Sequence, residues 1–328
     1  MMLSGLALAL AGLACSGGAS PQACPHGQVT GTCLCGGEKV SDGFCCFGAP
    51  SQTACLAVCP QGQVTGTCWC GGQEISSGHC CFGAPSASAC PSGALIADHT
   101  AAASFSAVPT SAITQAGAQF RIWYGHTSHG SQIVTGMDML AQELGAPYLY
   151  NQGGGTLQLT EESGDLGHEG DLAWEQTTRQ YLAQHAAEVN MVVWSWCGGA
   201  SDNTEQGIQT YLQAMDRLEQ DFPQIKFVYM TGHTDADAVE NLRARNAQIR
   251  SWCGNHAKVL FDFEDIESWD PAGNFYHDTG DDCGWCSNWC SNHSCPSCGE
   301  CAHSHCFNCY LKGKAFWWLL ARLSGWQG

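Results

Sequence analysis

Short apolar runs alternate with amphipathic segments through the second half of the chain. The strand-like runs, rich in aromatic and β-branched residues, occupy residues 119–125, 147–151, 190–196, 225–231 and 258–263. Helical periodicity is found at residues 131–144, 171–187, 204–221, 236–252 and 311–323. Strands separated by helices pair in parallel and are covered by helices on both faces. The pattern therefore predicts a three-layer α/β domain over residues 118–328, with a parallel sheet of about five strands.

The connection between the first predicted strand and the first predicted helix carries the leading candidate for chemistry. It reads Gly125-His-Thr-Ser128-His-Gly130, so two glycines bracket Ser128. A side chain on such a turn projects above the carboxyl edge of the sheet, where open α/β folds bind ligands. We interpret Ser128 as a candidate nucleophile, although the turn taken alone is also typical of an ordinary polar loop.

A long segment, residues 264–310, separates the fifth strand from the last helix and is far longer than a usual connection. Near its end lie His303 and His305, which a parallel sheet would bring to the same edge as Ser128. A serine nucleophile needs a base and an acid that orients the base. We take His303 as the base, with His305 as the alternative. The candidate acids are Glu300 and, further upstream, Asp278, Asp281 and Asp282.

Donors for a developing oxyanion are expected on the neighbouring loops. Gly154 follows the second predicted strand within a run of three glycines, and Asn203 follows the third strand. A bare backbone N–H or a side-chain amide at these positions would face the reacting carbonyl. His126 and His129 flank the serine and are expected to line the pocket.

Taken together, these blocks resemble the SGNH/GDSL-type hydrolases. The likeness is to the divergent bacterial branch whose first block reads Gly-His-x-Ser-x-Gly, as residues 125–130 do. The end of the chain, from Cys301-Ala-His303-Ser to the run Lys312–Trp326, is similar to that branch too. The resemblance covers residues 118–328. It implies a flavodoxin-like sheet, with Ser128 as nucleophile and His303 as base in ester hydrolysis.

Three features depart from the family pattern. There is no Gly-Asp-Ser, and the third block reads Gly199-Ala-Ser-Asp-Asn203 instead of Gly-x-Asn-Asp. Glu300 stands where an aspartate is expected before the histidine. The resemblance therefore supports the assignment of Ser128 more directly than the assignments of the oxyanion asparagine and the orienting acid.

Two copies of a cysteine-rich unit precede the α/β domain, at residues 24–55 and 59–90. They begin at Cys24 and Cys59, so the period is 35 residues. Each unit has six cysteines and few large apolar residues. Such a unit cannot build a hydrophobic core, so about three disulfides are expected to hold it together. A small polymer-binding module and a rigid spacer are both compatible with this pattern.

The chain has twenty-three cysteines in all, a number typical of an oxidising compartment. Without Cys15 they divide evenly: six in each repeat, eight in segment 264–310, and the two residues Cys197 and Cys253. This division predicts full pairing, including four disulfides in the long segment and a bond between Cys197 and Cys253. Zinc binding by the Cys-x-x-Cys steps is the alternative.

The start of the chain is typical of an exported protein. An apolar run within residues 1–15 has the length of a signal peptide and ends at Cys15, in a context that resembles a bacterial lipoprotein signal. Lipid attachment at Cys15, with membrane anchoring, and simple secretion are both open. Residues 91–117 are rich in Ala, Ser, Thr, Pro and Gly, a composition that predicts a linker.

Acidic residues outnumber basic ones by 30 to 12, which gives a net charge of −18 and argues against nucleic-acid binding. The sequence therefore predicts an exported serine esterase that needs no cofactor or metal and cleaves acetyl or other short-chain esters, with polysaccharide esters as the leading substrate class. One alternative is a non-catalytic surface protein that binds a glycan or polymer. The other is a metal-dependent hydrolase built on turn histidines such as His126, His129, His233 and His256.

Overall fold

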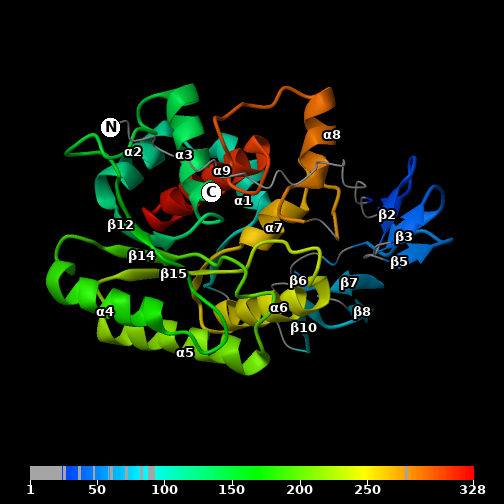
Figure 1. The fold of residues 1–328 in the computed structure, drawn as a ribbon, viewed down its shortest axis with the longest axis horizontal. Helices are drawn as coiled ribbons and strands as arrows, with labels where there is room; N and C mark the ends of the chain where they lie inside the picture. The colour runs from blue at the N-terminus through cyan, green and yellow to red at the C-terminus, as the bar shows by residue number, and fades with distance from the viewer. Residues whose placement is uncertain are drawn as a thin grey trace, which may run out of the picture.

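A computed structural model gives the architecture. It describes residues 24, 27–35, 38–46, 49–57, 59, 62–70, 73–81, 84–87, 93–277 and 280–328. The α/β domain is built on a six-stranded sheet, all parallel, in the order β11-β16-β15-β14-β12-β13. Figure 1 shows helices α1, α2, α3 and α9 on one face and α4, α5 and α6 on the other. The expected three-layer α/β arrangement is confirmed.

From β12 to β16, strands and helices alternate along the chain. The strands are β11 (Leu95–Ala97), β12 (Arg121–His126), β13 (Gln158–Ser163), β14 (Met191–Trp194), β15 (Lys226–Met230) and β16 (Val259–Phe261). The helices are α1 (His99–Ser104), η1 (Phe105–Ala107), α2 (Thr110–Gln119), α3 (Ser131–Leu144), α4 (Ala173–His185), α5 (Glu205–Asp221), α6 (Val239–Asn255), α7 (Phe263–Ser268), α8 (Gly284–Asn292) and α9 (Cys306–Leu323). The central strand β14 is buried at every position, as a strand covered on both faces requires.

The second strand is not where the apolar run predicted it. Residues 147–151 form no strand, and only Tyr150 makes a bridge, to Leu157. The strand is β13, whose sequence Gln-Leu-Thr-Glu-Glu-Ser is largely polar. It lies at the edge of the sheet and pairs only with β12, so its polar side chains remain in contact with water. An edge strand of this kind lacks the apolar run by which buried strands are recognised.

The expected linker at residues 91–117 is wrong from residue 95 onward. Here β11 adds a parallel edge strand beside β16, and α1 and α2 pack on α9. Asp98 caps α1 by accepting hydrogen bonds from the N–H groups of Thr100 and Ala101. Phe105 and Ile113 are buried in the core. The small alanines allow close helix packing, but a composition rich in alanine is also typical of a linker, which is why the sequence predicts one here.

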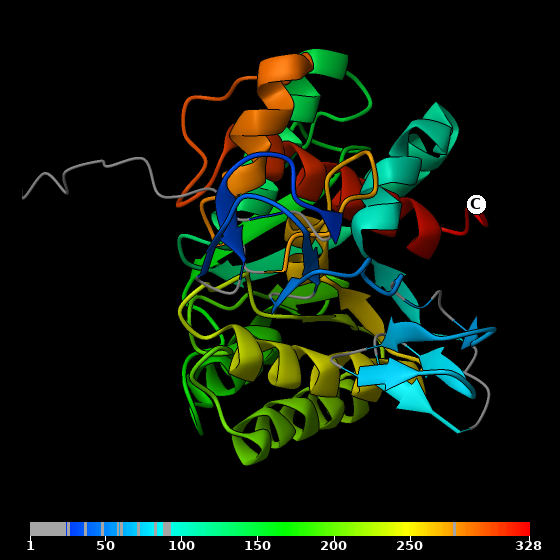
Figure 2. The same cartoon turned by 90° about the vertical axis from the view of Figure 1, so that its right-hand side faces the viewer.

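The two repeats form small β-units at one flank of the domain, and the second repeat lies next to α6 in Figures 1 and 2. Their strands are β1 (Gly27–Gln28), β2 (Cys33–Cys35), β3 (Glu38–Val40), β4 (Phe44–Cys46), β5 (Ala49–Ser51), β6 (Gly62–Gln63), β7 (Cys68–Cys70), β8 (Gln73–Ile75), β9 (His79–Cys81) and β10 (Ala84–Ser86). The disulfides are Cys24–Cys33, Cys35–Cys45, Cys46–Cys55, Cys59–Cys68 and Cys70–Cys80. The first repeat thus has its three expected bonds. A third bond is expected in the second repeat too, but Cys90, like residues 1–15 with Cys15, lies outside the described residues.

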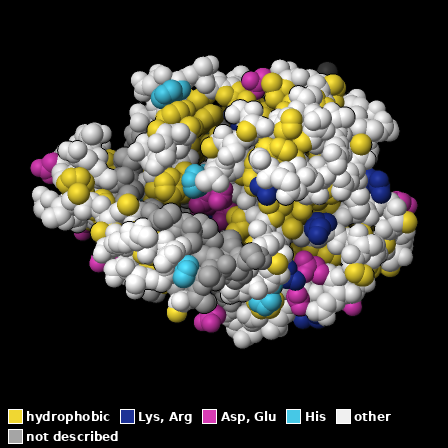
Figure 3. All heavy atoms as spheres, turned by 180° about the vertical axis from the view of Figure 1, so that it is seen from behind, with side chains coloured by type: hydrophobic (Ala, Val, Ile, Leu, Met, Phe, Trp, Pro, Cys, Tyr) yellow, Lys and Arg dark blue, Asp and Glu magenta, His cyan; other side chains and the backbone are white. Residues whose placement is uncertain are grey.

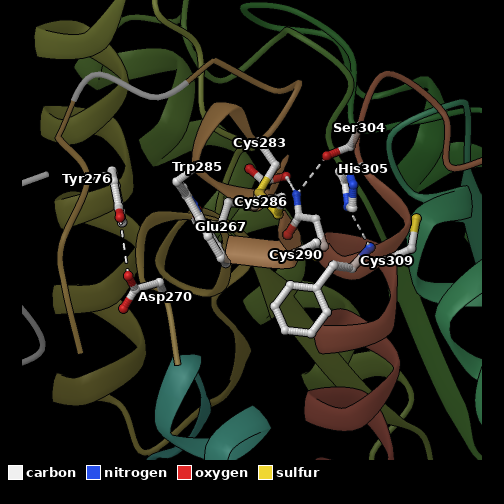
Figure 4. The surroundings of a disulfide bond; sticks show 12 residues. Glu267, Asp270, Tyr276, Cys283, Trp285, Cys286, Cys290, Ser304, His305 and Cys309 are labelled. Carbon is white, nitrogen blue, oxygen red and sulfur yellow. Dashed lines mark hydrogen bonds between the residues drawn. A yellow bond between two sulfur atoms is a disulfide. The ribbon is translucent and has the colours of Figure 1, made fainter. Parts of the chain in front are cut away.

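The long segment before α9 is held together as predicted. Its four disulfides are Cys283–Cys286, Cys290–Cys295, Cys298–Cys306 and Cys301–Cys309. Figure 4 shows the first of these beside Glu267 and Trp285, with Ser304 and His305 close by. Because two of the bonds reach into α9, they fix the end of the segment to the domain core. The number of disulfides indicates an exported or extracellular protein.

The expected bond between Cys197 and Cys253 does not form, and both cysteines are free. Cys253 is buried within α6. Cys197 lies just after β14, where its sulfur contacts His129. An even cysteine count permits full pairing but does not require it, and here the two residues belong to different elements with different neighbours.

A buried ion pair lies beneath the carboxyl edge of the sheet. The side chains of Lys312 on α9 and Glu267 on α7 are both 0% exposed, and their charged atoms are 2.6 Å apart. Lys312 also donates to Gln132 on α3. Glu267 accepts hydrogen bonds from the backbone N–H and the hydroxyl of Thr234, at 2.7 and 2.9 Å. The pair therefore joins three helices to the loop after β15.

Candidate functional site

Ser128 lies in the tight turn between β12 and α3, at the carboxyl edge of the sheet. Gly130 is required there for close approach rather than for an unusual backbone angle. A Cβ at this position would lie 2.2 Å from the Ser195 hydroxyl and 2.7 Å from the Tyr124 hydroxyl. Tyr124 donates a hydrogen bond of 2.9 Å to the Gly130 carbonyl. The turn is therefore packed tightly against β12 and the end of β14, which gives Ser128 a fixed position.

The structure brings Ser128 and His303 together across 175 positions of sequence. The Ser128 Oγ lies 2.9 Å from the His303 Nε2. His303 has φ of 60°, a left-handed conformation that side chains other than glycine seldom adopt. Two bonds hold this bend: the Cys301–Cys309 disulfide, and a hydrogen bond of 2.5 Å from the Gln132 amide to the Ala302 carbonyl. A serine and a histidine held this way satisfy the nucleophile–base geometry.

His129 occupies the centre of a stack of three imidazole rings. Its ring lies 3.7 Å from that of His233 and 4.5 Å from that of His303, nearly parallel to both. Its Nδ1 is 3.2 Å from the Cys197 sulfur, and its Nε2 is 3.1 Å from an Asp281 carboxylate oxygen. Burial alone would lower the pKa of His129, but the hydrogen bonds with Asp281 and Cys197 raise it to about 9. The ring is therefore an imidazolium at neutral pH.

Cys197 is the functional candidate that the sequence analysis missed. Its sulfur lies 3.6 Å from the Ser128 hydroxyl as well as against His129. The hydrogen bond with His129 lowers the pKa of Cys197 to about 6, against the opposing effect of partial burial. The sequence did contain one indication of a functional role: Cys197 directly follows a predicted strand, at the carboxyl edge where ligands bind. The even cysteine count instead predicts a disulfide between Cys197 and Cys253, so Cys197 was not expected to be a free thiol.

His233 is the neutral member of the stack. Its Nδ1 donates to the Thr234 carbonyl at 2.7 Å, and its Nε2 accepts from the Gly198 N–H at 3.1 Å. Burial lowers the pKa of His233, which keeps the ring uncharged beside the His129 cation. His233 therefore supports the position of His129 and fixes the turn after β14.

Of the expected acids that the structure describes, only Asp281 is brought to the histidines. The hydrogen bond and charge of His129 outweigh burial and lower the pKa of Asp281. Glu300 is exposed and has no hydrogen bond to His303 among the described residues. Asp282 lies next to Asp281 in the chain, and partial desolvation of its carboxylate together with the charge of Asp281 raises its pKa. Asp278 lies outside the described residues.

His305, the alternative base, has a structural role. Its Nδ1 accepts a hydrogen bond of 3.1 Å from the Phe307 N–H and caps α9, as Figure 4 shows. His126, expected in the pocket, is bonded instead to Glu161 at 2.8 Å and to the Thr127 carbonyl at 2.9 Å. Neither ring joins the stack around His129.

The two expected oxyanion donors have other positions. Gly154 precedes β13, so it lies at the amino edge of the sheet, opposite Ser128. The Asn203 amide donates to the Gly199 carbonyl at 2.8 Å and holds the turn after β14. The assignment of Gly154 is wrong because the second strand begins after the glycines and not before them. Within the described chain, the backbone N–H of Ser128 makes no hydrogen bond and is available to a substrate.

Among the residues that the structure describes, two groups of side chains are compact enough to contact a single metal ion. In one, donor atoms of His129, Asp281 and His303 all lie within 4.8 Å of one another. In this arrangement His129 is bonded to Asp281, and the Nε2 of His303 contacts Ser128. The other group consists of Asp98, His99 and Asp265 at the edge of the sheet.

A cavity of about 260 Å³ lies beside this second group and is separate from the serine turn. Its lining includes His99, Trp269, Pro271 and Leu311. His99 stacks on Trp269 at 4.5 Å and contacts the Asp265 carboxylate. No residue of the Ser128–His303 or His129–Cys197 contacts lines this cavity.

No family model matches the chain, and no curated protein is significantly similar to it. None of the helices in the described part of the chain has both the length and the apolar character needed to span a membrane. On the face shown in Figure 3, lysine and arginine side chains are scattered and form no continuous basic surface. The function is therefore inferred from the geometry of the site.

Proposed function

We propose that the protein is an exported serine hydrolase that cleaves acyl esters, with Ser128 as nucleophile and His303 as general base. The observation that carries this proposal is the 2.9 Å contact between the Ser128 Oγ and the His303 Nε2. Ser128 is partly exposed and His303 is exposed, so an ester can reach both. A buried, fully packed pair of the same geometry would have only a structural role.

In the proposed reaction, His303 removes the proton of Ser128 as its Oγ attacks the acyl carbon. The free N–H of Ser128 faces the developing oxyanion. His303 then returns the proton to the leaving alcohol, and water releases the acyl group by the same steps in reverse. Asp281 is the acid of this site, since its carboxylate lies within 4.8 Å of a ring nitrogen of His303. It acts as a positioning residue through its hydrogen bond with His129.

The topology supports the same assignment. Counted from β12, the five strands β13-β12-β14-β15-β16 have the order 2-1-3-4-5, which is the order of flavodoxin-like sheets. In such sheets, ligands bind where the strand order reverses, outside the carboxyl ends. Ser128 follows β12 and Cys197 follows β14, so both lie at that point. This agrees with the resemblance to SGNH/GDSL-type hydrolases, which also suggests acetyl or short-chain esters of polysaccharides as substrates.

Hydrolysis of p-nitrophenyl acetate and p-nitrophenyl octanoate by the full chain tests the proposal. Ser128→Ala and His303→Asn should each lower kcat/KM at least a thousandfold, because each removes a member of the reacting pair. Asparagine tolerates the left-handed backbone of position 303. The matched control is His305→Asn, which retains a helix-capping side chain and should retain activity.

Two results would contradict the proposal. Undiminished activity in Ser128→Ala that is lost on treatment with a chelator would indicate a metal-dependent hydrolase, the alternative favoured by the compact group His129, Asp281 and His303. No turnover of either ester by the parent protein, together with retention on an insoluble polysaccharide, would indicate a non-catalytic binding protein. A preference for acetate over octanoate would support short-chain esters.

A further inference from the structure

A second chain of contacts runs from Cys197 through His129 to Asp281. The serine mechanism gives the Cys197 sulfur no role. The Cys197 sulfur lies 3.2 Å from the His129 Nδ1, and the His129 Nε2 lies 3.1 Å from Asp281. This is the order of groups found in nucleophilic triads: a nucleophile, a histidine on one of its nitrogens, and a carboxylate on the other. The His129 ring is 6% exposed and is clamped between His233 and His303, so its orientation is fixed.

The charges around the sulfur favour a thiolate. The pKa of Cys197 lies at about 6 and that of His129 at about 9, so between these values the two form a thiolate–imidazolium pair. Asp281 carries a negative charge on the far side of His129, and the neutral ring of His233 covers one face. The Glu267 carboxylate adds to the raised pKa of His129 from below the site.

Cys253 is the internal contrast. It is fully buried in α6, and this burial raises its pKa well above the usual value, so it remains a thiol. Cys197 is only partly buried. Of the free cysteines in the described residues, Cys197 alone therefore combines accessibility with a cationic partner.

We propose that Cys197 is a second nucleophile, held as a thiolate by His129 and oriented through Asp281, and that it accepts acyl groups from activated esters and thioesters independently of Ser128. The sulfur attacks the carbonyl carbon and forms an S–C bond, and the bond from that carbon to the leaving oxygen or sulfur breaks. The His129 imidazolium gives its Nδ1 proton to the leaving group. Neutral His129 then takes a proton from water, whose oxygen attacks the thioester and releases the carboxylic acid and the thiolate.

This activity goes beyond the serine mechanism because it uses a different histidine. Ser128 contacts His303 and Cys197 contacts His129, while the two nucleophilic atoms are 3.6 Å apart. At that separation only one of them can hold an acyl group at a time. Because the two nucleophiles use different histidines, loss of Ser128 leaves the thiolate and His129 in place.

Acyl-enzyme trapping in Ser128→Ala tests the inference. This variant is mixed with p-nitrophenyl acetate at pH 7, quenched in acid, digested and examined by mass spectrometry. A 42 Da addition is expected on the peptide containing Cys197, and neutral hydroxylamine should remove it, since it cleaves thioesters faster than oxygen esters. Ser128→Ala/Cys197→Ala should show no such adduct, and Ser128→Ala/Cys253→Ala should show it in full.

The pH dependence of thiol reactivity provides a second readout that a structural role for Cys197 would not change. The rate of reaction with 4,4′-dithiodipyridine, taken as the difference between parent and Cys197→Ala, should rise with a midpoint near pH 6. In His129→Gln the midpoint should move toward 9. Because a more basic thiolate is also a better nucleophile, the rate should fall only roughly fivefold at pH 7 but roughly thirtyfold at pH 5.5. Asp281→Asn, a change at a half-buried side chain, should move the midpoint in the same direction.

The outcomes separate this inference from the serine mechanism. An unchanged midpoint near 8.5 in parent and His129→Gln, or no adduct on Cys197 in Ser128→Ala, would overturn the inference and leave the role of Ser128 intact. Full esterase activity in Ser128→Ala that is lost in Ser128→Ala/Cys197→Ala would support the inference and overturn the serine mechanism. A fall in turnover of at least a thousandfold in Ser128→Ala, with the Cys197 adduct retained and slowly hydrolysed, would support both.

Discussion

Replacing Lys312 by methionine tests whether the buried ion pair supports the site. Methionine fills a similar volume but removes the charge and the donors to Glu267 and Gln132. Glu267 then remains a buried carboxylate without its cation, which in other proteins costs about 3–5 kcal/mol. Its bonds from Thr234 and from the Asn308 amide persist and reduce this cost. We therefore expect a loss of about 3 kcal/mol, at the lower end of that range.

The measurement is urea denaturation with disulfides intact, followed by the fluorescence of the buried tryptophans, which include Trp285 and Trp317. Lys312→Met/Glu267→Gln is the matched control, because it removes both charges. Its stability should exceed that of Lys312→Met, so the two substitutions should be coupled by more than 1 kcal/mol, as residues in direct contact are. A loss below about 1 kcal/mol in Lys312→Met, or additive effects in the double variant, would refute the reasoning.

Further predictions concern the turn, the acid and the thiolate pair. In Gly130→Ala, the new methyl group would meet the Ser195 hydroxyl at 2.2 Å, so a loss of about 1–3 kcal/mol in thermal unfolding and a fall in kcat are expected. Glu300→Gln should retain esterase kcat/KM within about twofold, whereas Asp281→Asn should lower it at least tenfold; equal effects would contradict the assignment of the acid. The raised pKa of His129 adds to the free energy of unfolding, and this contribution is lost as pH rises through about 9. The lowered pKa of Cys197 adds a second contribution, which is lost as pH falls through about 6. The melting temperature of Cys197→Ser should therefore fall furthest below that of the parent between these pH values, and a difference independent of pH would contradict the ion pair.

Hydrophobic periodicity predicts most of the α/β domain because buried strands and amphipathic helices have clear patterns. The periodicity does not predict elements that bury few large apolar side chains. The edge strand β13 is polar, so periodicity places the second strand at the apolar run before it, residues 147–151. The helices α1 and α2 bury mainly alanines and other small side chains, and their composition is that of a linker.

The site was predictable as far as sequence places residues on one edge of a sheet. The contact between Ser128 and His303 is predictable because Ser128 follows a recognisable strand and His303 precedes a recognisable helix of a parallel fold. Asp281 could not be separated from the neighbouring acids, since the path of the disulfide-bonded segment decides which carboxylate reaches His129. Cys197 could not be distinguished from a disulfide partner without knowing that Cys253 is buried elsewhere.

The measurement that tests the central claim most directly is covalent labelling with a fluorophosphonate, mapped to a residue by mass spectrometry of the digested protein. A fluorophosphonate reacts with a serine only when a neighbouring base removes the proton from its hydroxyl. A single phosphonylated serine, Ser128, is expected in the parent protein and in His305→Asn, and none is expected in His303→Asn. Absence of label at Ser128 in the parent, or equal labelling in His303→Asn, would contradict this claim.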